Sequence, residues 1–240
     1  MTSSPLVLCY HAISDEWGDP LAVSPRALEA QVRHLLGRRL RPVDAAAILD
    51  APERSFHVTF DDAYRSVENI LPRLRSLGVG VTVFACSDLA PEGAPLAVPE
   101  VAPRAVGHER EILTMDWEAL RRAADLGVEI GSHTRSHPHL TRLADGELRS
   151  ELAGSRDALE ANLERPCRFL AYPYGEMDER VRLAARQAGY DAAYGLRSKP
   201  SRGAYGIPRT DIYRDDGQIR FRVKTSRFLP LARAAAELLR

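Results

Sequence analysis

Two adjacent carboxylates and a closely spaced pair of histidines are the residues of this chain best suited to metal chemistry. Asp61 and Asp62 follow an apolar run, and His133 and His137 stand four residues apart after another. Two imidazoles and one carboxylate are the usual protein ligands of a catalytic metal ion that keeps one position open for water. We therefore predict one divalent metal ion, zinc; cobalt and nickel also suit these ligand types.

The remaining carboxylate of the pair would then be free for proton transfer. Neighbours on a regular strand point to opposite faces, so both can enter one pocket only where the strand ends and the backbone turns. One would bind the metal, and the other would take a proton from the metal-bound water. The two histidines would share a face if one helical turn followed their strand. Simpler interpretations exist: Asp62 could cap a helix, and His108 and His139 are expected to face solvent in loops.

Short apolar runs that alternate with amphipathic segments predict the framework around these residues. The runs predicted as buried strands are 6–10, 56–60, 79–85, 128–131, 169–172 and 192–195. The segments with helical spacing are 25–37, 64–77, 117–126, 145–163 and 178–188. This alternation predicts a parallel α/β architecture, either open or closed into a barrel. The active site of such a protein forms where the strands end, which is where the His, Asp and Tyr side chains stand.

We expect a single domain over residues 1–240, with an insertion loop near 88–113 and a C-terminal helix near 229–240. The insertion is indicated by a stretch rich in Pro, Ala, Gly and Val. Acidic and basic residues balance at 33 each, so no field of one sign would attract nucleic acid or a membrane. No signal peptide or transmembrane segment is visible, and three scattered cysteines favour a reducing compartment. We therefore expect a cytoplasmic protein, with its oligomeric state left open.

Three motifs at the predicted strand ends resemble those of the polysaccharide deacetylase family (NodB homology, carbohydrate esterase family four). They are Thr59-Phe60-Asp61-Asp62-Ala63, His133-Thr134-Arg135-Ser136-His137 and Tyr172-Pro173-Tyr174-Gly175. The resemblance spans about residues 5–212 and implies an α/β fold, a distorted (β/α) barrel of about seven strands. It also implies that Asp61 is the catalytic base and that Asp62 is the carboxylate that binds the metal with both histidines.

The third motif implies a role for the backbone as well. In the family, the N–H of the tyrosine corresponding to Tyr174 stabilises the oxyanion, a contribution of roughly 3 to 4 kcal/mol per donor. The same motif implies that Tyr172, Pro173 and Tyr174 contact the substrate.

Two further active-site residues of the family are absent from their usual sequence positions. Many members have an arginine that holds the catalytic aspartate where this chain has Ala171, and we hypothesise that Arg209 replaces it. The family's late Leu-x-His motif, which supplies the general acid, is also absent after residue 175. Tyr10-His11 is similar to the opening of the poly-N-acetylglucosamine deacetylases, in which an N-terminal histidine is the acid. His11 is therefore expected to protonate the leaving amine, unless it only hydrogen-bonds a loop.

The function implied is removal of an N-acetyl group from an amino-sugar substrate: a glycan, a sugar conjugate or a natural-product intermediate. Because no export signal is visible, a small molecule or oligosaccharide is favoured as the partner. The near alternative is hydrolysis of another amide, such as a formamide or a cyclic imide, on the same fold. More distant alternatives are a non-heme Fe(II) oxygenase, which uses the same ligand types, and a non-catalytic carbohydrate-binding relative.

Overall fold

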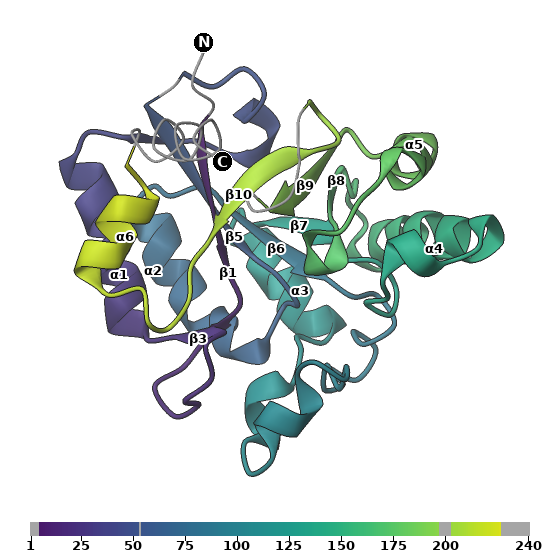
Figure 1. Cartoon of the computed structure of the whole chain (residues 1–240), viewed down its shortest axis with the longest axis horizontal. Coiled ribbons are helices and arrows are strands. Elements are labelled where there is room, and N and C mark those ends of the chain that lie inside the picture. Colours follow the sequence, from purple (N-terminus) through teal and green to yellow (C-terminus); the bar gives the residue numbers. More distant parts are fainter. Residues whose placement is uncertain (1–4, 53, 197–202, 227–240) are drawn as a thin grey trace, which may run out of the picture.

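The computed structural model describes residues 5–52, 54–196 and 203–226, and its centre is a ring of parallel strands (Figure 1). The strands are β1 (Leu6–Tyr10), β4 (Arg41–Pro42), β5 (Ser55–Phe60), β6 (Val81–Ala85), β7 (Glu129–Ser132), β8 (Phe169–Ala171), β9 (Ala192–Leu196) and β10 (Ile207–Asp211). They pair in the order β1-β10-β9-β8-β7-β6-β5, and β1 also pairs with β5, which closes a seven-stranded ring. The short β4 adds to one end of β5. The predicted barrel of about seven strands is thus confirmed.

Helices cover the outside of the ring; all but α6, which follows β10, lie between successive strands. They are α1 (Pro25–Gly37), α2 (Leu71–Ser76), α3 (Trp117–Asp125), α4 (Asp145–Leu163), α5 (Glu179–Gln187) and α6 (Gln218–Lys224). Side-chain caps fix several starts: Ser24, Asp116 and Asp178 each accept a hydrogen bond from a backbone N–H three residues later. Such caps satisfy donors that the first helical turn leaves free. These three helices, α1, α3 and α5, therefore begin where the sequence offers a capping side chain.

Two predicted elements differ from those observed. The segment 64–77 begins as a 3-10 helix (Arg65–Ile70) and becomes α-helical only at Leu71, since Pro72 has no N–H to bond back into the preceding turn. The strand β10 was not among the apolar runs predicted as strands. The C-terminal helix predicted near 229–240 lies outside the described residues.

The region of the predicted insertion leaves the barrel between β6 and α3 and projects at the bottom of Figure 1. It contains two short 3-10 helices, Ala102–Ala105 and Glu109–Ile112. Its two halves are tied together where the Leu96 N–H donates to the Ile112 carbonyl at 2.8 Å. The segment therefore has a defined conformation beside the carboxyl ends of the strands.

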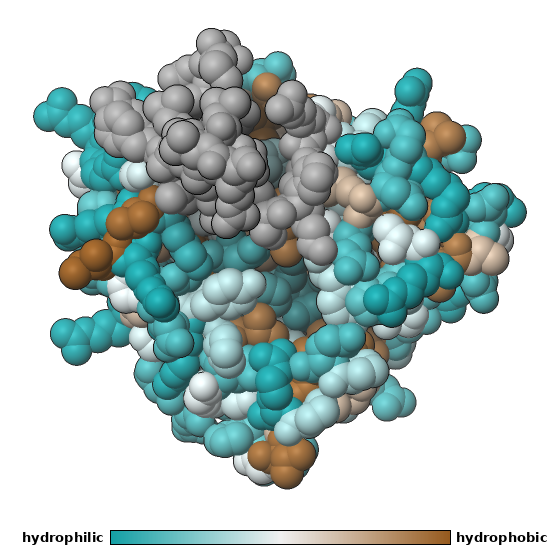
Figure 2. Space-filling model, in the orientation of Figure 1, coloured by the Kyte–Doolittle hydropathy of each residue, from teal (hydrophilic) through white to brown (hydrophobic). Residues whose placement is uncertain are grey.

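The surface in Figure 2 is mostly hydrophilic, and its hydrophobic residues lie in small separate areas. The apolar side chains are concentrated instead in a core that fills the barrel and the space beneath the helices. Among the described residues, no helix has the length and apolar character needed to span a membrane.

Candidate metal centre

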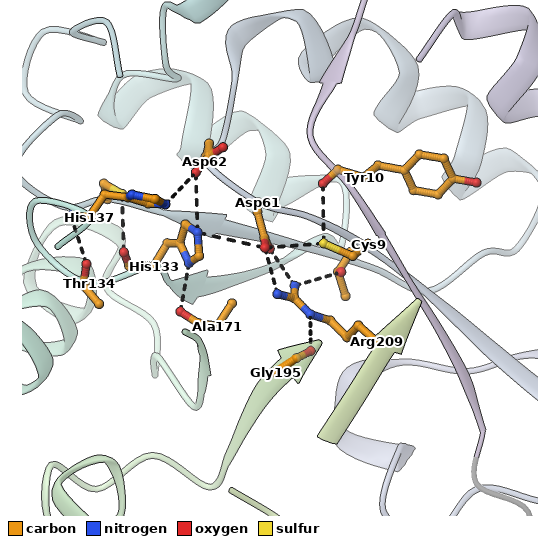
Figure 3. Close-up of polar contacts among 12 residues, drawn as sticks. Cys9, Tyr10, Asp61, Asp62, His133, Thr134, His137, Ala171, Gly195 and Arg209 are labelled. Carbon is orange, nitrogen blue, oxygen red and sulfur yellow. Dashed lines mark hydrogen bonds and ion pairs between the residues drawn. The ribbon is translucent and has the colours of Figure 1, made fainter. Parts of the chain in front are cut away.

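Asp62, His133 and His137 converge on one point at the carboxyl ends of the strands (Figure 3). Oδ1 of Asp62 lies 3.4 Å from Nε2 of His133 and 3.4 Å from Nε2 of His137. Ligands held about 2.0 to 2.1 Å from a tetrahedral zinc ion are about 3.4 Å from one another. Oδ1 of Asp62 is also buried and accepts no hydrogen bond within the described part of the chain. The three side chains therefore fit one small divalent ion.

Both histidines are in the form that binds a metal. Nδ1 of His133 lies 2.8 Å from the Ala171 carbonyl oxygen, which can only accept, so Nδ1 carries the proton and Nε2 is free to bind. Burial lowers the pKa of His133 and of His137 to about 4. Each imidazole is therefore neutral near pH 7, as a metal ligand must be.

The backbone that presents the histidines is a loop, and the predicted helical turn is wrong. Thr134 and His137 have positive φ angles of 72° and 64°. Side chains supply the bonds that a helix would have made: Ser132 Oγ accepts from the Thr134 N–H, and Thr134 Oγ1 accepts from the His137 N–H. The two rings nevertheless meet with their centroids 4.9 Å apart.

The aspartate pair lies where the backbone turns at the end of β5. Asp62 has a φ angle of +67° and Ala63 one of +48°, so the strand geometry ends directly after Asp61. Both carboxylates consequently reach the pocket, and each is only 4% exposed. The alternative of a helix cap is not observed, since the following 3-10 helix starts after Tyr64 without a side-chain cap.

Asp61 is paired with Arg209 of β10, a strand separated from β5 in the ring by β1. Nη1 and Nη2 of Arg209 donate to Oδ1 and Oδ2 of Asp61 at 2.6 and 2.7 Å. Burial would raise the pKa of Asp61, but the Arg209 guanidinium outweighs it and holds that pKa well below its usual range. This is the contact that the Arg209 hypothesis requires, and it keeps Asp61 ionised beside the candidate metal ligands.

A second cluster, Cys9, His11 and Asp61, also brings possible ligand atoms within 4.8 Å of one another. Both oxygens of Asp61 already accept hydrogen bonds from Arg209, however, and the guanidinium would repel a cation there. Of the two clusters, Asp62, His133 and His137 are therefore the better candidate to hold a metal ion. His11 is half-buried near Asp61, and its Nδ1 has no hydrogen-bond partner among the described residues, so a loop contact through that atom is not observed.

The third motif separates into a buried part and an accessible one. The Tyr172 side chain is 0% exposed, and its hydroxyl donates to the Tyr205 carbonyl; Pro173 is buried as well. Their burial argues against the predicted substrate contacts of both residues. Tyr174 is half-buried, has a φ angle of +58°, and packs its ring 4.7 Å from that of His137. Its backbone N–H has no acceptor among the described residues.

Two residues beside Tyr174 were not predicted as part of the site. The His139 ring stacks on that of Tyr174 with centroids 4.0 Å apart, so the expectation that His139 faces solvent is wrong. The Tyr174 hydroxyl donates to Glu100 at 3.0 Å. The sequence did offer a signal that His139 belongs to the site, because it stands two residues after His137. Nothing near Glu100 in the sequence indicated that its carboxylate contacts Tyr174. His108 is exposed, as predicted.

The sequence profile described as polysaccharide deacetylase matches residues 49–193, which include the aspartate pair, both histidines and the third motif. The chain belongs to the polysaccharide deacetylase family. It is thereby placed among hydrolases of the deacetylase type. Membership favours hydrolysis over the oxygenase alternative.

Individual relatives are similar to this deacetylase in sequence or in fold. The chain is 25% identical over 219 residues to YxkH of Bacillus subtilis (strain 168), a match that covers 86% of this chain and 70% of YxkH. Its fold resembles that of the Streptococcus pyogenes deacetylase PplD in complex with acetate, with a TM-score of 0.75, 17% identity, and coverage of 94% and 100%. It also resembles IcaB from Ammonifex degensii, with a TM-score of 0.75, 20% identity, and coverage of 93% and 98%.

Proposed function

We propose that this deacetylase is a metal-dependent N-deacetylase that removes an acetyl group from an amino sugar, with one divalent ion, zinc, bound by Asp62, His133 and His137. The observation that carries the proposal is the convergence of these three ligands next to a carboxylate held by a buried arginine. The whole chain is proposed to act as one catalytic domain.

The proposed roles of the residues follow from their positions. A bound zinc ion would polarise the acyl oxygen and lower the pKa of water. Asp61, ionised and fixed by Arg209, would accept the proton of the water that attacks the acetyl carbon. The Tyr174 N–H would donate to the oxygen that becomes negative during this attack. His11 would give a proton to the leaving amine as the carbon–nitrogen bond breaks, so that acetate and a free amino sugar are released.

A small or oligomeric amino-sugar substrate is proposed rather than a long polymer. The burial of the site supports this proposal, because the proposed metal ligands and Asp61 are each at most 7% exposed. The cytoplasmic location stays a prediction. Hydrolysis of a formamide or cyclic imide is the alternative outcome, and separate assays for acetate, formate and amine distinguish it.

Removal of the metal is expected to abolish acetate release and to destabilise the fold. A chelator-treated sample should regain activity when zinc is added, as measured by acetate release from N-acetylglucosamine oligomers. Zinc at about 100 times its Kd should raise the free energy of unfolding by about 2.7 kcal/mol, because it binds only the folded state. The variant His137→Ala should lose this zinc-dependent shift in Tm. Full activity after chelation, with no metal detected by elemental analysis, would contradict the proposal.

Substitution of the proposed acid, His11→Gln, is expected to lower kcat by about 10²- to 10⁴-fold. The bound metal should remain, because His11 is not among the three ligands. Acetate release and metal content are measured on the same preparation, with His108→Gln as a matched control at an exposed histidine. An unchanged kcat in His11→Gln would refute the assignment of the acid.

A further inference from the structure

The segment 88–113 is fastened to the rim of the barrel at two separate places. On one side, the Arg104 guanidinium pairs with the Asp19 carboxylate at 3.0 Å, and the Arg104 carbonyl accepts from the Trp17 indole at 3.1 Å. Trp17 is 1% exposed, and the Asp19 side chain is 2% exposed. These two residues lie in the connection from β2 (Ala12–Ile13) to β3 (Ala22–Val23), which follows β1. The first attachment therefore joins the segment to buried residues of the loop after β1, while the Arg104 side chain itself is 40% exposed.

On the other side, Glu100 joins the segment to the loops after β7 and β8. Its Oε2 accepts from the Tyr174 hydroxyl at 3.0 Å, and its Oε1 lies 3.5 Å from Nε2 of His139. The Tyr174 and His139 rings are stacked, so one carboxylate holds both. Nε of Arg104 also donates to the Glu100 carbonyl at 2.7 Å, which links the two attachments to each other.

The base of the segment is tied to the turn that carries the proposed metal ligand Asp62. The Met115 N–H donates to the Ala63 carbonyl at 2.8 Å, and Thr114 forms an antiparallel bridge with Tyr64. The segment is thus attached to the loops after β1, β5, β7 and β8. In the ring these strands stand in the order β1-β5-β6-β7-β8, so the attachments cover one continuous arc of the rim.

We propose that the segment 88–113 is a strap, latched at Glu100 and Arg104, that closes one side of the substrate site and restricts it to the terminal amino-sugar unit of a chain or to a small conjugate. A polymer bound through an internal unit must leave the site in two opposite directions. The strap blocks the arc from β1 to β8, so only one exit remains. This inference rests on the proposed function and names its substrate class.

The experiment compares the dimer N,N′-diacetylchitobiose with the hexamer hexa-N-acetylchitohexaose as probes for the zinc-loaded full-length chain. The position of each deacetylated unit is read by tandem mass spectrometry. The wild type should deacetylate only a terminal unit of the hexamer. A double variant, Glu100→Ala with Arg104→Ala, should deacetylate internal units as well and raise the hexamer-to-dimer ratio of kcat/KM at least tenfold. Glu92→Ala, an exposed acidic residue of the same segment, should retain the wild-type pattern.

Hydrogen exchange supplies a readout that does not need activity. Amides of residues 94–106 should be protected in the wild type and in Glu92→Ala and should exchange faster in the double variant. If the double variant does not fold, Glu100→Ala alone serves instead, because Glu100 is 47% exposed at its side chain. Wild-type deacetylation of internal units, or an unprotected segment, would overturn the strap. Absence of acetate release from both probes would overturn the proposed function and the substrate class with it.

Discussion

The substitution Asp61→Asn should lower kcat for acetate release by about 10²- to 10⁴-fold while the metal stays bound. The amide has nearly the same shape as the carboxylate but cannot accept a proton from water. Asp61 lies beside the proposed metal ligands, with its Oδ2 3.9 Å from Nε2 of His133, and is not itself assigned to the ion. Elemental analysis of the variant should therefore find the wild-type amount of metal.

The measurement must separate chemistry from folding, because the amide leaves the Arg209 guanidinium buried without a carboxylate. Thermal unfolding of Asp61→Asn identifies a temperature at which the variant is folded, and kcat is measured there. Asp88→Asn is the matched control, since Asp88 pairs with Arg135 at an exposed position. A variant Asp61→Asn with kcat close to that of the wild type would exclude Asp61 as the base.

The substitution Arg209→Ala should reduce the free energy of unfolding by about 3 to 5 kcal/mol, because it leaves a buried carboxylate unpaired. Arg209 is 0% exposed and lies over the Phe84 ring at 5.4 Å, so the change also removes packing inside the barrel. Because the ion pair is buried, we expect the variant to lose stability as well as activity.

The same substitution should move the acid limb of the pH–activity profile to higher pH. In the wild type, Arg209 outweighs burial and keeps the pKa of Asp61 low, so the base stays ionised as the pH falls. Without Arg209, burial raises this pKa, and the base takes up a proton at a higher pH. The profile of kcat/KM is measured beside urea unfolding, with Arg65→Ala as control. Arg65 forms an exposed ion pair with Asp116, worth about 0 to 1 kcal/mol. An unshifted acid limb would show that Arg209 does not tune Asp61.

Local patterns in the sequence predicted most of the framework. Six of the strands in the ring are apolar runs that the sequence marks clearly, because both faces of such a strand are buried. The seventh, β10, contains Pro208 and Arg209, and a proline normally argues against a central strand. β10 lies between β9 and β1, and its arginine is buried by pairing with Asp61. That pairing allows a strand with an arginine to lie in the barrel, where its backbone pairs with β1 and β9.

What the sequence by itself determined is the set of side chains in the proposed metal centre. Asp61 and Asp62 are adjacent, and His133 and His137 are four residues apart, so short-range geometry at two strand ends presents them. The tertiary structure decided what surrounds them. Arg209 reaches Asp61 across 148 residues of sequence, and Glu100 reaches Tyr174 across 74. Such contacts exist only once the ring has closed, because no local pattern encodes which distant loops then become neighbours.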